Sequence, residues 1–223
     1  MARVVLVGLL YVICELYLND ILLYASNEED VLNNLRKVFE RCRQYNITVN
    51  PKKCKFGLAE VEYVGHTINS HGISFTQEKI LKCIALRKPS NVGELQTFLG
   101  FANYFRDHIA NHSIMAKPLH DLTTRGASSK HPILWNDTAE DSYDKLITAI
   151  KNCPTLYFLQ DGAEVFLHTD ASDYGIGAYL FQRKDSRDYP AAFVSKALIK
   201  AQLRWSTHEK EAYAIYSAFM RLD

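Results

Sequence analysis

The sequence lacks a strong net charge. Its 223 residues include 26 Lys and Arg against 25 Asp and Glu, which leaves +1 at neutral pH. A strongly basic chain would have indicated nucleic-acid binding by composition alone. This chain does not, so any nucleic-acid partner has to be argued from motifs.

A regular cysteine pattern is also absent. The cysteines are odd in number, widely scattered and form no Cys-x-x-Cys pair: Cys14, Cys42, Cys54, Cys83 and Cys153. Such a pattern predicts neither a disulfide framework nor a zinc site. It indicates reduced, partly buried thiols in an intracellular protein.

The apolar run near the start is too short to cross a membrane. Val4 to Cys14 is 11 residues long, whereas a membrane span needs about 20. The run resembles the core of a secretory signal, but no small-residue cleavage site follows and a strand pattern continues to Tyr24. We therefore favour a strand joined to an unusual leader by a truncation or a misplaced start, with no membrane partner.

The length and the 48% content of hydrophobic residues allow one or two packed domains, at about 150 residues per domain.

The first clear element is a hairpin. Apolar alternation on both sides of Asn19-Asp20 predicts a tight turn at this polar pair. A carboxylate there is well placed to hold a divalent cation, because hard cations prefer oxygen ligands on a rigid support. A plain Asx turn is the alternative.

Helical spacing replaces the strand pattern after this hairpin. A capping box at residues 26–29 predicts a helix with an apolar face of Val31, Leu32, Leu35, Val38, Phe39 and Cys42. Residues 47–56 predict strand, turn and strand. The lysines of that turn either meet phosphates or form an ordinary basic surface.

A second hairpin and a helical region follow. Residues 61–68 and 72–75 predict strands around a turn at 69–71, with Gly72 available for positive φ. Thr76 and Asn91 are expected to cap helices. The second helix places Leu95, Phe98, Leu99, Ala102 and Phe105 on one face, which is typical of a core. His108 and His112 have metal-like spacing, but without a third ligand no metal is expected.

The last third of the chain predicts three strands and a helix. A linker is expected at 125–130, and a domain boundary near Pro154. Strands at 164–172, 175–182 and 190–195 form a meander, whose glycines are expected to turn the second strand away from the first. A capping box at 206–209 starts a helix that carries Glu211 on an apolar stripe. Because an unpaired carboxylate there is costly, a metal shared with Asp170 is the expected partner.

These segments resemble the polyproteins of gypsy-type LTR retrotransposons over roughly positions 11 to 223. The resemblance rests on motifs for the polymerase hairpin, the primer grip, the thumb and the ribonuclease H domain. The polymerase hairpin motif is Tyr17–Ser26, and the primer-grip motif is Tyr63–His66. The thumb motif is Phe98–Arg106, and the ribonuclease H motifs are Thr169–Ser172 and His208–Ala212.

The resemblance implies a two-metal, Mg²⁺-dependent reverse transcriptase and ribonuclease H. Asp20, Asp170 and Glu211 carry over as catalytic metal ligands. The family's substrate contacts carry over to Tyr17, Tyr63, Gly65 and His66.

Other family ligands are missing from the sequence. Asn19 replaces the first aspartate of the hairpin, a third palm aspartate would lie before Met1, and further ribonuclease H ligands would lie after Asp223.

The implied fold class is α+β, a partial palm and thumb followed by a partial ribonuclease H-like domain. The expected parts are the palm with its primer-grip hairpin (1–75), thumb and connection helices (76–154), and the first half of ribonuclease H (155–223). Two hypotheses follow. Either the chain is a piece of an active polymerase and hybrid nuclease, or it is a catalytically dead remnant that at most binds RNA–DNA hybrid.

For the isolated chain we favour the second hypothesis, and we expect no polymerase activity. The implied partners are RNA–DNA hybrid or primer–template nucleic acid and the rest of the polyprotein. The implied location is the cytoplasm.

Overall fold

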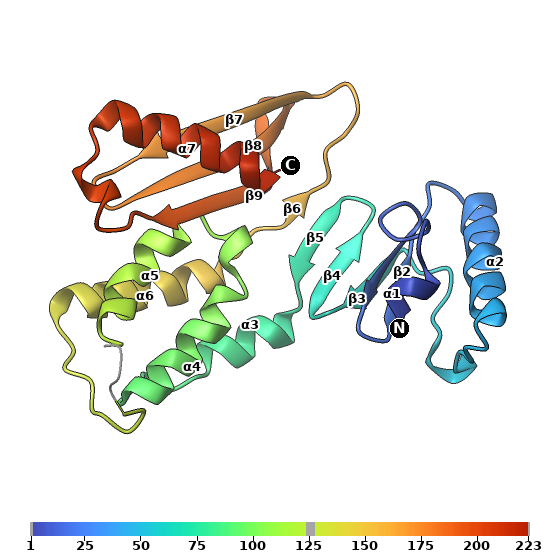
Figure 1. Cartoon of the computed structure of the whole chain (residues 1–223), viewed down its shortest axis with the longest axis horizontal. Coiled ribbons are helices and arrows are strands. Elements are labelled where there is room, and N and C mark those ends of the chain that lie inside the picture. Colours follow the sequence, from blue (N-terminus) through green and yellow to red (C-terminus); the bar gives the residue numbers. More distant parts are fainter. Residues whose placement is uncertain (1, 124–127, 223) are drawn as a thin grey trace. The chain divides into compact units, whose positions relative to one another are not determined.

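The computed structural model describes residues 2–123 and 128–222, with only the backbone of residues 2 and 3 (Figure 1). The chain divides into two compact units, Met1–Val64 and Gly65–Asp223. The functional division at residues 75 and 154 stays a prediction. No helix within the described ranges is long and apolar enough to cross a membrane.

The first unit is a hairpin packed against one long helix. Its elements are α1 (Ala2–Val5), β1 (Cys14–Tyr17), β2 (Asp20–Leu23), α2 (Glu28–Gln44), a 3-10 helix (Pro51–Lys53) and β3 (Glu60–Tyr63). The core joins Val5, Leu6 and Cys14 to Val38 and Cys42 of α2. Where an unusual leader was expected before the hairpin, the chain forms α1 and turns up to Ile13. The strands expected in 47–56 are wrong, because Asn50 caps a 3-10 turn there.

The turn of the first hairpin lies one residue earlier than predicted. Leu18 and Asn19 form it, with Leu18 at a positive φ of 53°. Asp20 is therefore the first residue of β2, paired across the strands with Tyr17. The register of β1 and β2 is fixed by their cross-strand pairing, which the polar pair Asn19-Asp20 alone does not specify.

The helix after the hairpin also begins later than its predicted cap. Asn27 rather than Ser26 is the N-cap of α2, and its side-chain oxygen accepts from the Asp30 backbone N–H at 2.9 Å. Two predicted core residues of this helix, Leu32 and Phe39, are exposed. The buried stripe of α2 is narrower than the predicted apolar face because a single hairpin covers it.

The second unit contains a helical layer that matches the predicted helices. It comprises α3 (Gln77–Ile84), α4 (Val92–Asn103), α5 (His112–Asp121) and α6 (Asp137–Lys151). Thr76 and Asn91 cap α3 and α4 as expected. The predicted core face of α4 is buried. Pro118 lies inside α5.

The predicted linker at 125–130 lies partly outside the described residues. Its described end packs on α4, where Gly93 N–H donates to the Ser129 carbonyl at 2.8 Å.

Three short strands connect to this layer. β4 (His66–Asn69) and β5 (Gly72–Phe75) are antiparallel, and β6 (Leu156–Tyr157) pairs with β5. The predicted strand at 61–68 is broken at Val64 and Gly65, which both have positive φ. Gly72 does not need positive φ. A Cβ there would lie 2.1 Å from the Leu156 carbonyl oxygen, so the close approach of β6 requires glycine.

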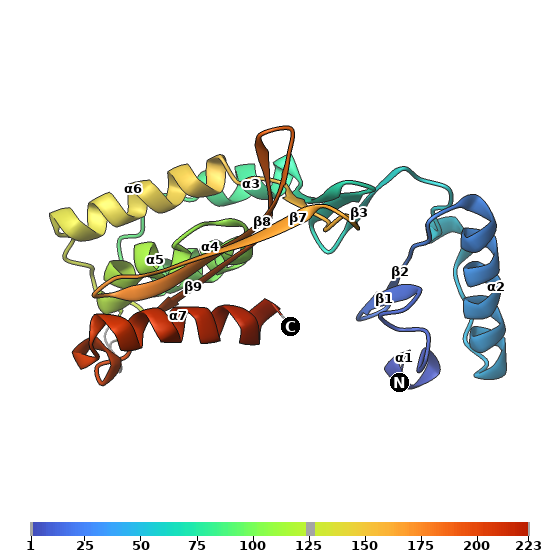
Figure 2. The ribbon, with the colours of Figure 1, turned by 90° about the horizontal axis from the view of Figure 1, so that it is seen from above.

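The predicted meander and final helix are confirmed. The strands β7 (Glu164–Ala171), β8 (Gly175–Lys184) and β9 (Arg187–Ala197) are antiparallel in that order, and α7 (Thr207–Leu222) packs on them (Figure 2). Ser206 and Glu209 form the predicted capping box. Ile176 packs with Ala214 of α7.

The glycines of β8 serve a different purpose from the one expected. Cβ atoms on Gly175 and Gly177 would lie 2.7 Å from Ile114 and 2.6 Å from Asn111. Side chains alternate along a strand, so these positions lie on the face opposite Ile176. The glycines therefore admit the start of α5, and the sheet lies between α5 and α7.

Candidate catalytic carboxylates and their surroundings

The hairpin of the first unit brings three predicted site residues together. Asp20 is exposed and pairs across the strands with Tyr17. The Tyr63 hydroxyl donates to the Asp20 main-chain carbonyl at 3.3 Å. Burial raises the pKa of Tyr63, and the negative charge of Glu15 adds to the rise. Tyr63 is thus protonated near neutral pH and ties β3 to the hairpin.

Glu15 is an acidic neighbour that the sequence reasoning missed. It lies two residues before Tyr17 on β1, and alternation places both on the face that carries Asp20. Its charge also contributes to the raised pKa of Tyr24. The i, i+2 spacing of Glu15 and Tyr17 was the available signal.

Asn19 occupies the turn beside Asp20 and is exposed. Its amide is neutral and offers one carbonyl oxygen where the family has a carboxylate. The tip of the hairpin therefore presents a single carboxylate, Asp20, to any cation.

The other two predicted contacts, Gly65 and His66, lie in the second unit beside Tyr104. The Tyr104 hydroxyl lies 3.3 Å from His66 Nδ1, and the His66 and Phe75 rings are 4.7 Å apart. A Cβ at Gly65, whose φ is 76°, would lie 2.9 Å from the same hydroxyl. Both residues are thus packed in an aromatic cluster, and their role with a primer stays a prediction.

Asp170 and Glu211 come from neighbouring elements of the second unit. Asp170 lies near the end of β7 and is exposed, whereas Glu211, in α7, is half-buried. Ala171 packs under α7, so alternation directs Asp170 to the other face of the strand. On α7, Glu211 lies on the flank away from Tyr213, which contacts β9. This flank is therefore the β7 side of the helix.

Lys210, between the two glutamates of the motif, is a further residue that the sequence reasoning missed. Its side chain is 7% exposed, and its ammonium lies 2.9 Å from the carboxylate of Asp173, in the turn after β7. Glu209 holds the helix cap and is not free for a metal. The position of Lys210 one residue after the capping box was the only feature of the sequence that could have pointed to its contact with Asp173.

These carboxylates do not form a complete metal centre in the part of the chain that the structure describes. No group of three or more His, Cys, Asp or Glu side chains suited to a metal is found there. The donors themselves are carboxylate oxygens, the type that Mg²⁺ prefers, and Mg²⁺ is often held by one or two carboxylates with water and substrate phosphates. The carboxylate oxygens are therefore suitable ligands for Mg²⁺, but their number allows at most one Mg²⁺ ion.

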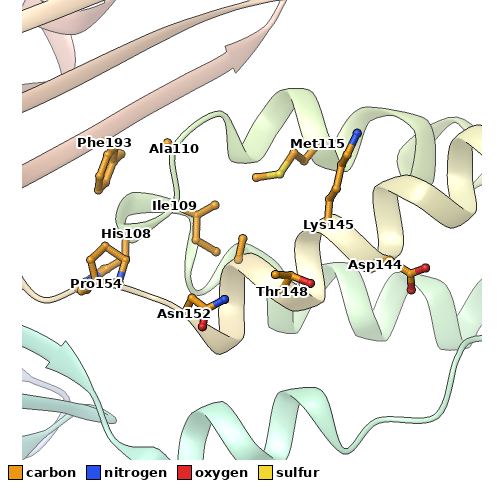
Figure 3. A pocket seen from close by; sticks show the side chains of 11 residues that line it. His108, Ile109, Ala110, Met115, Asp144, Lys145, Thr148, Asn152, Pro154 and Phe193 are labelled. Carbon is orange, nitrogen blue, oxygen red and sulfur yellow. The ribbon is translucent and has the colours of Figure 1, made fainter.

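The two histidines with metal-like spacing are structural. His108 Nδ1 lies 3.0 Å from the Pro154 carbonyl, and His112 Nε2 lies 3.0 Å from the Ala102 carbonyl. Burial lowers the pKa of both. His108 borders a cavity of about 540 Å³, which is lined mainly by apolar groups such as Met115 and Phe193 (Figure 3).

Two protein families match this chain. Residues 4–68 match "Reverse transcriptase (RNA-dependent DNA polymerase)", and residues 135–223 match "RNase H-like domain found in reverse transcriptase". Among curated relatives, the transposon Tf2-3 and Tf2-7 polyproteins of Schizosaccharomyces pombe are each 31% identical over 206 residues, 92% of this chain. The chain spans 15% of the length of these relatives.

Solved structures share the fold. A foamy viral protease-reverse transcriptase in complex with RNA/DNA hybrid matches 99% of this chain and 29% of its own, with a TM-score of 0.77 and 22% identity. A foamy viral protease-reverse transcriptase in complex with dsDNA gives a TM-score of 0.75 at 22% identity, over 99% of this chain and 45% of its own.

Proposed function

This chain belongs to the gypsy-type retrotransposon polyproteins, as a segment with reverse transcriptase and RNase H-like parts, and we propose that it binds RNA–DNA hybrid or primer–template nucleic acid without polymerising DNA by itself. The rest of the polyprotein is its proposed partner in catalysis, in the cytoplasm.

Binding is supported by the neighbours in structure, which were solved in complex with RNA/DNA hybrid or double-stranded DNA. The net charge of +1 gives little general attraction for phosphates. Affinity then depends on local contacts and on the shape of the hybrid, and should fall as salt rises.

The replacement of a family aspartate by Asn19 is the observation that carries the polymerase part of the proposal. Asp20 would hold Mg²⁺ through its carboxylate, with Tyr17 and Tyr63 beside it. The exposed amide of Asn19 brings no negative charge to the same tip. Hard divalent cations favour charged oxygen ligands, so the hairpin binds the metal too weakly for phosphoryl transfer.

In the RNase H-like part, Asp170 and Glu211 would each offer a single carboxylate to Mg²⁺, because alternation places Asp170 on the face of β7 opposite α7 and the two do not converge on one ion. Such an ion, when bound, polarises a phosphate and lowers the pKa of a bound water. Two carboxylates are fewer than a pair of ions requires, so we propose that the chain alone does not cleave hybrid.

The test combines binding, primer extension and cleavage with one purified chain in Mg²⁺. We expect labelled RNA–DNA hybrid to bind, with affinity lost between about 50 and about 200 mM salt, and no extension or cleavage. Cleavage that disappears in D170N and E211Q would overturn the claim of inactivity in the RNase H-like part. Primer extension by the wild-type chain would overturn the role given to Asn19, and absence of hybrid binding would overturn the proposal itself.

The matched control for extension is N19D, which returns a carboxylate to the tip without changing its size. We expect it to raise Mg²⁺ affinity at the hairpin, measured by Mn²⁺ relaxation enhancement with Mn²⁺ as the probe. A D20N variant is expected to lower it. Equal affinities in the wild-type, N19D and D20N chains would contradict metal binding at this tip.

A further inference from the structure

A basic cleft lies at the β9 edge of the sheet in the second unit. It has a volume of about 700 Å³ and is lined by residues of η2 (Arg106–His108), α5, β9 and α7. The elements α5, β9 and α7 are labelled in Figure 1. Four cationic side chains line it, together with two tyrosines of α7: Arg106, Lys117, Lys196, Arg221, Tyr213 and Tyr216.

The acidic groups at this cleft are fewer than the cations. Asp107 accepts from Arg221 at 3.2 Å and lies 3.7 Å from Arg106 Nε. Lys117 pairs with Asp121. Lys196 forms no ion pair with a carboxylate anywhere in the described ranges. The cleft therefore carries excess positive charge, and Lys196 is the cation least neutralised by protein.

Lys196 is held instead by an aromatic residue. Its ammonium donates to the Tyr213 hydroxyl and lies 5.0 Å from the Tyr213 ring centroid. This hydrogen bond lowers the pKa of Tyr213, with a further contribution from Gln202. The contacts fix the position of an exposed ammonium while leaving its charge available to an anion.

Tyr216 adds a flat apolar surface beside that charge. It is 59% exposed, and its ring lies 6.4 Å from that of Tyr213 at an interplanar angle of 24°. Nearly parallel rings next to a lysine are the combination that binds single-stranded nucleic acid, because bases stack on the rings while cations contact phosphates. An acidic peptide would use the charge but not the exposed ring.

We propose that this cleft binds a single-stranded segment of nucleic acid, with Lys196 and Arg106 on the phosphates and Tyr216 stacked on a base. The inference rests on the proposed function, since it assumes a nucleic-acid-binding chain. The site lies on the β9 side of α7, whereas Glu211 lies on the β7 side. It is thus separate from the candidate carboxylates.

The test measures fluorescence anisotropy of a labelled oligothymidylate of about 12 nucleotides and, in parallel, of an RNA–DNA hybrid. In the double variant K196A/Y216A we expect oligothymidylate affinity to fall about tenfold or more, with a salt dependence reduced by about one charge. Hybrid affinity is expected to change less than about threefold, which is within the range of one weak contact.

The matched control is K200A/Y174A, which removes an exposed lysine and an exposed tyrosine that do not line the cleft. Equal thermal midpoints of the two double variants and the wild-type chain establish that folding is unchanged; if K196A/Y216A is less stable, the single variant K196Q replaces it. The proposal would be overturned if both double variants lost oligothymidylate affinity equally, or if K196A/Y216A lost none. Wild-type binding of hybrid without oligothymidylate would overturn this site alone, whereas binding of neither would overturn the proposed function.

Discussion

Lys210 and Asp173 join the first turn of α7 to the turn between β7 and β8. The ammonium and the carboxylate are 2.9 Å apart, yet the side chains are 7% and 86% exposed. The lysine is thus buried while its partner lies in solvent. This contact holds the segment that carries Glu211 against the one that follows Asp170.

Removing Asp173 and removing Lys210 should lower the free energy of unfolding by different amounts. D173A leaves a buried ammonium without its carboxylate, and we expect the free energy of unfolding to fall by about 1–3 kcal/mol. K210M keeps the apolar volume and removes the charge, so we expect a smaller loss, below about 1 kcal/mol. Urea denaturation measures both.

The double variant D173A/K210M is the control for this pair. Without the ammonium, the loss of Asp173 should cost nothing further, so the double variant should match K210M. Additive losses would show that the two side chains act independently.

Gly72 is expected to be intolerant of any side chain. A Cβ there meets the Leu156 backbone, which cannot move without breaking the pairing of β5 and β6. We expect G72A to lower the free energy of unfolding by about 1–3 kcal/mol. G100A is the matched control, because a Cβ in that position of α4 meets nothing within 4 Å. It should stabilise the chain by about 0.5–1 kcal/mol.

Stability should fall on mild acidification because of His108 and His112. Burial lowers the pKa of each in the folded state, and the carbonyls of Pro154 and Ala102 only partly oppose this. Below about pH 6.5 the unfolded chain therefore binds more protons than the folded one, so the free energy of unfolding decreases as pH falls. Urea denaturation at about pH 7.5 and about pH 5.5 measures the difference.

The variant H112N tests the assignment of this pH dependence. It removes one titrating ring and should flatten the decline in the free energy of unfolding, whatever it does to stability at neutral pH. An unchanged slope would assign the dependence to other groups.

Two cysteines should resist alkylation in the folded chain. Burial raises the pKa of Cys83 to about 11 and that of Cys153 to about 12. Because the thiolate is the reactive form, iodoacetamide at about pH 8 should leave both unmodified until the chain is denatured. Mass spectrometry of peptides from native and denatured samples detects this, with the half-buried thiol of Cys54 as the comparison. Early labelling of Cys83 would contradict its place in the core.

Local patterns predicted much of the second unit. The caps at Thr76 and Asn91, the buried face of α4, and the three-strand meander with its helix follow from spacing and side-chain hydrogen bonds within a few residues. The first unit was harder, because residues 47–56 have strand composition but form no strand. Their backbone groups are satisfied by turns and a 3-10 helix instead.

The sequence by itself determined the family, the capped helices α3 and α4, and the meander with its final helix, since all of these depend on residue type and near spacing. Only the tertiary structure decided that Tyr63 bonds to the backbone of Asp20, that Gly177 admits α5, and that Lys210 is buried against Asp173. Such contacts join residues far apart along the chain. Their geometry depends on how whole elements pack, which no local pattern specifies.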